Sequence, residues 1–155
     1  MSDLVNRILD CVPPGTSGMH ALFRLVDIVE SDDVPTAAIE GGHAPRMLVN
    51  PTFAARYAAT PERLLMLVMH ELHHVILGHT RLLPVSTPLD NIVFDAVINA
   101  MLCRAFPDPR GIALFTDFYA ADEVPAALLR PSDGWEPSRL GRPASPSRAL
   151  IRSGH

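Results

Sequence analysis

Four of the seven histidines lie within ten consecutive positions, in the segment 70–79. The segment begins with the pattern HExxH, in which His70, Glu71 and His74 hold the fixed positions. Residues four apart share one face of a helix, so the two imidazoles can bind one zinc ion at about 2.0 to 2.1 Å. Glu71 can then accept a proton from a water in the open coordination position. The spacing therefore predicts a site with one Zn²⁺ and with Glu71 as general base.

An HExxH pattern fixes only three positions, so it also arises by chance, usually on the solvent-facing side of an amphipathic helix. Here the expected helix is apolar on nearly every side, as in the run from Leu64 to Met69. Two imidazoles and a carboxylate buried there without partners would each cost several kcal/mol. That cost favours a metal site over a chance match.

A catalytic zinc ion needs a third protein ligand, and the sequence favours Asp95. This residue lies on the next expected helix, with Asn99 one turn later, so the carboxylate can bind the ion while the amide hydrogen-bonds a ligand histidine. The alternative for Asp95 is a buried carboxylate paired with an arginine. His79 is the competing third ligand, but it follows Gly78, where the helix is expected to end. We therefore place His79 behind the ligands or facing the substrate.

Two helix starts position these residues. Thr60-Pro61 and Thr87-Pro88 each place a capping threonine before a proline that suits the first helical position. The first start predicts a helix that ends at Gly78, and the second predicts a helix that continues to Phe106. One apolar face of the second helix, of the kind that normally packs on a core, is traced by Leu89, Ile92, Val93, Ala96, Val97, Ala100 and Met101.

The region before these helices predicts a first helix and a small sheet. Ser2 is a suitable N-cap for the first helix, and the segment 19–29 fits a buried helix better than a strand. The runs 34–40 and 46–50 flank two glycines, which predicts a hairpin. We expect 46–50 to be an edge strand that a substrate peptide could join, although a purely structural hairpin is an equal alternative. The fold class predicted is α+β and helix-rich, with a small sheet or hairpin beside a buried HExxH helix.

The composition is typical of one globular domain, since 48% of the 155 residues are hydrophobic and 19% are charged. We expect this domain to span residues 1–129. The segment 130–155 is rich in Pro, Ser, Gly and Arg and holds few large apolar residues. Such a segment cannot offset the entropy cost of ordering, so the sequence predicts a disordered tail.

Charge and hydropathy bear on partners and location. The formal net charge is -4 and the 13 Lys and Arg residues are scattered, which argues against nucleic acid binding. No stretch approaches the ~20 apolar residues that span a bilayer, and the N-terminus lacks the basic and apolar regions of a leader peptide. We therefore expect a cytoplasmic protein that does not bind membranes. Cys11 and Cys103 are expected to be small buried apolar residues.

The stretch from Val34 to about Leu129 resembles the HExxH, zincin-like metallopeptidase domain that in bacterial proteins is usually followed by a von Willebrand factor A-like domain. The residues that carry the resemblance are Asn50-Pro51, His70, Glu71, His73, His74, Gly78, His79, Arg81, Asn91, Asp95, Ile98 and Asn99. The resemblance implies a zincin-like α+β domain with His70, His74 and Asp95 as metal ligands and Glu71 as the catalytic residue. It also implies a von Willebrand factor A-like domain or protein as a partner.

Three functions compete at this point. The first is a zinc-dependent metallopeptidase, in which a metal-bound water activated by Glu71 attacks a carbonyl of a peptide or protein substrate. The second is a non-catalytic module for partner binding or assembly, with a structural or vestigial zinc site. The third, a deformylase-like amidase, would need an upstream cysteine ligand in a Gly-Cys-Leu context, whereas Cys11 lies in Asp10-Cys11-Val12. The sequence favours the first.

Overall fold

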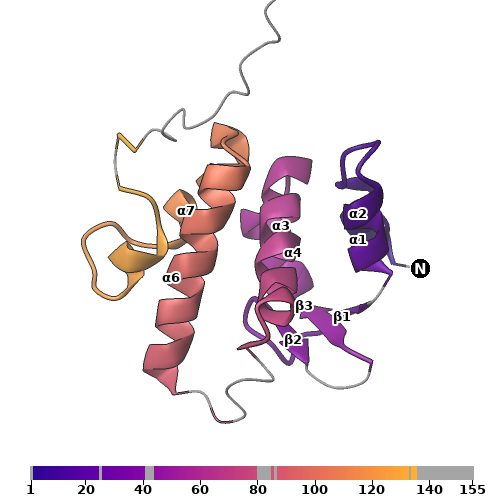
Figure 1. The fold of residues 1–155 in the computed structure, drawn as a ribbon, viewed down its shortest axis with the longest axis horizontal. Helices are drawn as coiled ribbons and strands as arrows, with labels where there is room; N and C mark the ends of the chain where they lie inside the picture. The colour runs from indigo at the N-terminus through magenta and orange to yellow at the C-terminus, as the bar shows by residue number, and fades with distance from the viewer. Residues whose placement is uncertain are drawn as a thin grey trace, which may run out of the picture.

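The computed structural model describes residues 2–24, 26–40, 44–79, 85, 87–132 and 134–135. Within these residues the chain forms helices and a small three-stranded mixed sheet, which confirms the predicted α+β class. The N-terminal helices and the sheet lie on one side of a central helix, and the C-terminal helices lie on the other (Figure 1). No helix among the described residues is long and apolar enough to cross a membrane.

The central helix, α4 (Pro61–Ile76), carries the HExxH residues. The Thr60 hydroxyl accepts a hydrogen bond from the Arg63 amide, and the helix is followed by Gly78 at a φ of 69°, as the cap residues predicted. All nine residues of the run 64–72 are buried. They pack against α1 (Asp3–Asp10), α6 (Pro88–Ala105) and α7 (Pro109–Phe118). The predicted burial of the HExxH helix is therefore confirmed.

The sheet has the order β1-β3-β2. Strands β2 (Ala37–Glu40) and β3 (Arg46–Val49) are antiparallel, which confirms the predicted hairpin, although its two glycines lie outside the described residues. The prediction of a helix over 19–29 is wrong in its second half, because α2 (Ser17–Phe23) ends early and β1 (Asp27–Glu30) pairs in parallel with β3. Ser2 caps α1 as predicted.

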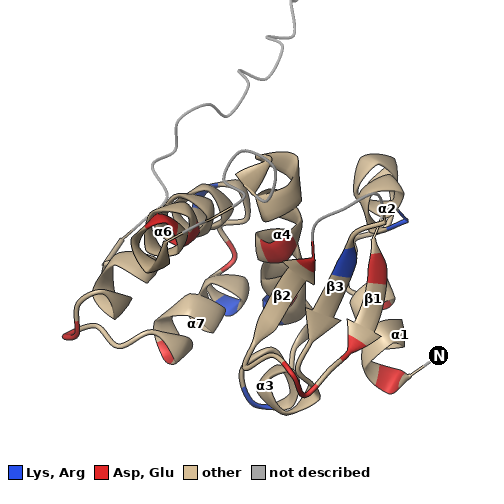
Figure 2. Cartoon of the chain, turned by 90° about the horizontal axis from the view of Figure 1, so that it is seen from below, with Lys and Arg blue, Asp and Glu red and all other residues tan. Residues whose placement is uncertain are grey.

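The prediction that 46–50 forms an edge strand is also wrong. Strand β3 lies in the centre of the sheet and is paired on both sides, so its backbone has no free edge to offer a peptide. Strand β2 is at the edge instead, and it contacts α4 (Figure 2). A free strand edge therefore does lie beside the HExxH helix, but it belongs to the other strand of the hairpin.

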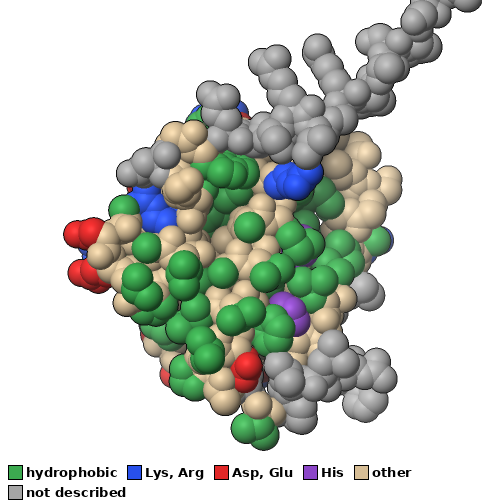
Figure 3. Space-filling model, turned by 60° about the vertical axis from the view of Figure 1, so that its left-hand side comes forward, with side chains coloured by type: hydrophobic (Ala, Val, Ile, Leu, Met, Phe, Trp, Pro, Cys, Tyr) green, Lys and Arg blue, Asp and Glu red, His purple; other side chains and the backbone are tan. Residues whose placement is uncertain are grey.

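Helix α6 is where the structure differs most from the expected packing. Its bounds and its capping box between Thr87 and Asp90 agree with the predicted start. The predicted apolar face, however, is turned outward, with Leu89 68% exposed and Val93 51% exposed. Hydrophobic side chains are accordingly spread over the side of the molecule that carries α6 (Figure 3). The buried residues of this helix are Ile98, Asn99, Leu102 and Cys103.

Helices α3 (Pro51–Tyr57) and α7 pack near the centre of the domain. Helix α3 follows β3 and is capped by Asn50, and α7 packs closely against α4 at Gly111. A Cβ at Gly111 would lie 3.0 Å from Met66 Cγ. The segment that follows α6 thus forms a regular helix.

A short 3₁₀ helix, η1 (Ala126–Leu129), packs against α6 at the end of the predicted domain. Beyond it, Trp135 is partly buried against the core. Residues 136–155 lie outside the described residues, so the disordered tail stays a prediction. Both Cys11 and Cys103 are buried, as expected for small apolar residues.

Candidate metal centre

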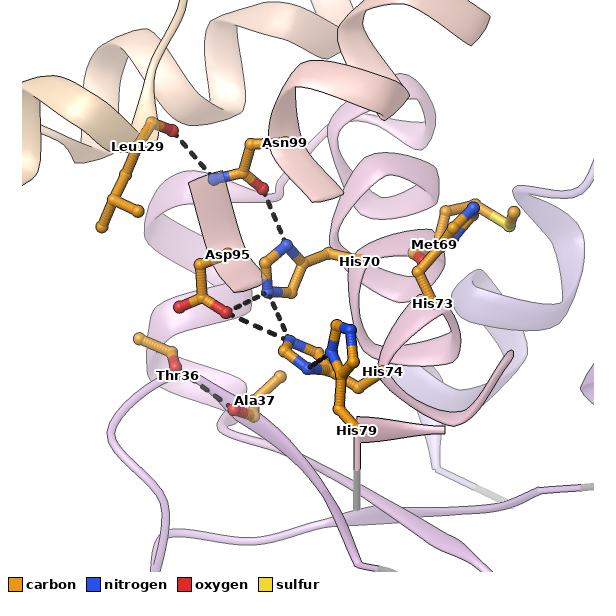
Figure 4. A network of polar contacts seen from close by, with 10 residues as sticks. All are labelled: Thr36, Ala37, Met69, His70, His73, His74, His79, Asp95, Asn99 and Leu129. Atoms are coloured by element: carbon orange, nitrogen blue, oxygen red, sulfur yellow. Dashed lines mark hydrogen bonds and ion pairs between the residues drawn. The ribbon is translucent and has the colours of Figure 1, made fainter. Parts of the chain in front are cut away.

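Helices α4 and α6 bring His70, His74 and Asp95 together (Figure 4). The Nε2 atoms of the two histidines lie 3.2 Å apart. Asp95 Oδ1 lies 3.2 Å from Nε2 of His74 and 3.5 Å from Nε2 of His70. Donor atoms bound at about 2.0 to 2.2 Å to a tetrahedral ion are separated by roughly 3.3 to 3.6 Å. The three atoms therefore form a triangle of the size that one metal ion needs, and the group could hold such an ion.

The helical spacing explains why these side chains meet. His70 and His74 are one turn apart on α4, and Asp95 and Asn99 are one turn apart on α6, so each pair lies on one helical face. These two faces are turned toward each other where the helices pack. The inward face of α6 thus turns Asp95 and Asn99 toward the histidines, whereas the apolar stripe that contains Leu89 and Val93 lies outside.

Asn99 fixes the orientation of the His70 ring. The Asn99 side-chain nitrogen donates to the Leu129 carbonyl at 2.8 Å, which leaves its Oδ1 to face His70 Nδ1 at 2.7 Å. An amide oxygen only accepts hydrogen bonds, so Nδ1 of His70 must carry the proton. The neutral His70 ring therefore has its lone pair on Nε2, which is the tautomer that metal binding requires. The protonated ring instead donates from Nε2 to Asp95.

His79 contacts Nδ1 of His74, as Asn99 contacts Nδ1 of His70. The Nδ1 atoms of the two rings lie 3.1 Å apart, and the His79 ring stacks on Phe94 with a centroid distance of 3.7 Å. When His74 presents Nε2 to an ion, its Nδ1 carries the proton and donates to His79. Among the described residues, the group close enough to share an ion contains Asp95 and not His79.

The remaining described histidines point elsewhere. His73 Nδ1 lies 2.6 Å from the Met69 carbonyl, and His20 Nδ1 lies 3.1 Å from the Thr16 carbonyl. Neither belongs to the group that could hold an ion. His43 and His155, which the sequence also leaves outside the site, are not among the described residues.

The electrostatics of the group follow from burial and from its own charges. Burial raises the pKa of the Glu71 carboxyl above its ordinary value, although His70 and His74 oppose this effect. For Asp95, burial acts in the same direction, but hydrogen bonds from the two histidines outweigh it and lower the pKa. Burial would lower the pKa of His70, yet its hydrogen bond to Asp95 and the nearby carboxylates raise it overall. Glu71 is therefore a stronger base than a surface glutamate.

These residues open into one cavity of about 370 Å³. Glu71 lines it together with the three residues of the triangle and His79. Several other residues in its wall belong to no motif that points to this site, among them Phe94, Tyr119 and the strand segment 36–39. Burial and the charge of Asp95 raise the pKa of Tyr119 to about 12, so its hydroxyl stays protonated and can donate a hydrogen bond.

The fold and the site together define a class: an α+β protein whose two central helices present two histidines and an aspartate that could bind a metal ion, beside a buried glutamate. Comparison with models of known families, with curated proteins and with solved structures produced no match. The function must therefore be argued from the chemistry of this site.

Proposed function

We propose that this chain is a zinc-dependent peptide hydrolase of the zincin type. In this proposal His70, His74 and Asp95 hold the ion, and Glu71 is the general base. The observation that carries it is the triangle of donor atoms, 3.2 to 3.5 Å on each side, in the same cavity as the buried Glu71. The motif residues that resemble the bacterial metallopeptidase domain support the same function.

The donor set favours a catalytic zinc site over a structural one. Structural zinc ions have four protein ligands, whereas catalytic ions have three and keep one position open. Three donors converge among the described residues, and their group faces a cavity. Two histidines and a carboxylate also serve iron in oxygenases. The carboxylate of Glu71 lines the same cavity, and it favours hydrolysis because a hydrolase needs a proton acceptor at this place.

The residues of the chain have separate tasks in this reaction. A zinc ion held there supplies a Lewis acid that polarises the carbonyl and makes water more acidic. Glu71 takes a proton from the attacking water as the oxygen bonds to the carbonyl carbon. The same carboxyl then gives the proton to the amide nitrogen as the carbon–nitrogen bond breaks. Asn99 keeps His70 in the tautomer with a free Nε2, and His79 can accept the hydrogen bond from Nδ1 of His74 when that ring binds the ion.

Strand β2 gives the substrate a place to bind. It is the edge strand nearest α4, and its residues from Ala37 to Ile39 line the cavity. An extended peptide can pair with such an edge through main-chain hydrogen bonds. We infer that the substrate lies along β2, which takes the role that the sequence had suggested for the strand at 46–50.

Metal analysis and hydrolysis of peptides by the full-length chain test the proposal together. We expect about one zinc ion per chain and cleavage of a mixed peptide library that stops with a chelator and returns with added zinc. If Fe²⁺ restores the activity and zinc does not, the ion of this site is iron and the zinc assignment is wrong. A zinc-loaded wild type that cleaves nothing, together with a His70→Ala variant that unfolds, would overturn the proposal in favour of a partner-binding module.

We expect zinc binding to weaken as the pH falls. Zinc binds a neutral imidazole, so it must displace the proton that the raised pKa of His70 retains. The affinity should fall about tenfold for each pH unit below that pKa. Zinc affinity measured by competition with a chromophoric chelator across a pH series checks this, and an affinity independent of pH would contradict it.

The metal-free fold should show the opposite dependence. A pKa that is higher in the folded state means that the folded protein binds more protons than the unfolded chain. This contribution to stability is fully present below the ordinary pKa of histidine and is lost as the pH rises through the pKa of His70. Urea unfolding of the metal-free protein at the same pH values measures it.

A further inference from the structure

The cavity beside the triangle has a polar side and an apolar side. The triangle, Glu71 and His79 form the polar side. Helices α3, α4 and α7 and the residue that follows α7 form the apolar side. We call it the aromatic wall, and its members are Phe53, Leu67, Leu114, Phe115, Phe118 and Tyr119. None of these side chains carries a charge.

The aromatic wall is held rigidly by ring contacts. Phe118 meets Phe53 edge to face at a centroid distance of 5.0 Å, and it meets the Tyr119 ring at 4.8 Å. Tyr57 packs behind both phenylalanines, 5.2 Å from Phe53 and 5.1 Å from Phe118. Edge-to-face pairs of this kind are favourable beyond the area they bury. The wall is therefore preformed.

The wall adjoins the reacting groups directly. The Phe115 ring centroid lies 6.5 Å from that of His70, and both residues line the cavity. A peptide whose carbonyl lies at the triangle must place a neighbouring side chain against this wall. The cavity volume of about 370 Å³ is near the lower end of the 300 to 1,000 Å³ typical of ligand pockets. There is space for about one large side chain beside the scissile bond.

The chemistry of the wall decides which side chain fits. A charged side chain would lose its hydration there and find only the Tyr119 hydroxyl as a polar partner among the wall residues. An apolar side chain would gain about 25 cal/mol for each Å² of apolar surface removed from water. A small side chain such as that of alanine would leave most of the wall in contact with water and would add little binding free energy.

We propose that the aromatic wall selects peptides with a bulky apolar or aromatic side chain next to the scissile bond. The proposal rests on the hydrolase function proposed above. Phe118 and Tyr119, which are only partly buried, are the specificity-determining residues, while the nearly inaccessible Leu114 and Phe115 form the floor.

Blocked peptides of alanine and glycine with one varied residue test this specificity. The varied residue is Phe, Leu, Ala, Asp or Lys, and the cleaved bond is located by mass spectrometry. We expect cleavage next to Phe or Leu with a kcat/KM about 10 to 200 times that for the Ala peptide. The Asp and Lys peptides should be no better than Ala. Cleavage that favours Asp or Lys, or that ignores the varied residue, would overturn the proposal but leave the hydrolase function intact.

Phe118→Leu should reduce the ratio of Phe to Ala cleavage at least severalfold, because it removes an aromatic face from the wall. Phe106→Leu is the matched control, since Phe106 is partly buried outside this cavity, and its ratio should equal that of the wild type. Should Phe118→Leu fail to fold in thermal unfolding, Tyr119→Leu replaces it. An unchanged ratio in the folded wall variant contradicts the proposal.

A binding measurement separates this proposal from the hydrolase function. N-acetyl-phenylalaninamide and N-acetyl-alaninamide are titrated into the zinc-loaded protein and followed by NMR. If no peptide is cleaved, but the phenylalanine probe binds more tightly and Phe118→Leu removes the difference, the hydrolase proposal fails and the apolar site stands. If both probes bind equally, the apolar site fails whatever the cleavage result.

Discussion

Replacing Glu71 with glutamine should abolish nearly all peptide hydrolysis while the protein keeps its zinc. Glutamine has almost the same volume, so it can occupy the buried position, where Glu71 is 7% exposed, without a cavity or a clash. Its amide cannot take the proton from water. General base catalysis contributes about 10² to 10⁴ in rate, so we expect kcat/KM to fall by a factor in this range. Steady-state kinetics and metal analysis on the same preparation measure both quantities.

The matched control is Glu123→Gln, which makes the same chemical change at an exposed position away from the cavity. Its activity and zinc content should match those of the wild type. If Glu71→Gln keeps full activity, Glu71 is not the base. If it loses zinc in parallel with activity, the carboxylate acts by holding the site together, and the proposed division of roles is wrong.

The helices that carry the site could be predicted because their ends depend on local chemistry. Thr60-Pro61 and Thr87-Pro88 specify a cap and a first helical residue within a few positions, whatever the rest of the chain does. The positions of His70 and His74, and of Asp95 and Asn99, then follow from helical periodicity. The relation between two residues one turn apart is fixed before any tertiary contact forms.

The strand β1 could not be predicted in this way. An apolar run such as 19–29 is compatible with a helix or a strand, and the choice at Asp27–Glu30 is made by pairing with β3, almost twenty positions later. Pairing also decides which strand lies at the edge. Because β1 pairs with the side of β3 that the hairpin leaves open, β3 becomes the central strand while β2 stays at an edge, and nothing in the hairpin itself specifies this.

The packing face of α6 shows the same limit in a different form. Apolar residues occur on more than one face of this helix, so periodicity cannot select the buried face, and the more regular stripe containing Val93 and Val97 lies outside. The buried Asn99 is paired with His70 across the helix interface, and this pairing offsets the cost of burying a polar group. The aromatic wall could not be predicted from the sequence, because its members come from helices that are far apart in the chain and meet only in the folded protein.

Among the residues around the triangle, Asp95→Ala should cause the largest loss of zinc affinity. Asp95 supplies one of the three converging donor atoms, so its removal takes away a bond to the ion and also the negative charge that offsets the ion's charge. Asn99→Ala and His79→Ala remove groups that only orient the histidines, and such changes typically cost about 10- to 100-fold in affinity. Asp95→Ala should exceed that range.

Zinc affinities of the three variants, measured by chelator competition at one pH, decide the order, with Asp122→Ala as the exposed carboxylate control. If His79→Ala loses as much zinc affinity as Asp95→Ala, His79 is the third ligand.

The metal-free proteins give a second test that does not involve zinc. Because Asp95 raises the pKa of His70, that pKa, followed by NMR, should fall in Asp95→Ala. It should change less in His79→Ala, because His79 contacts His74 rather than His70. An unchanged His70 pKa in Asp95→Ala would mean that the carboxylate does not face the histidines in solution. The proposed set of three converging donor atoms would then be wrong.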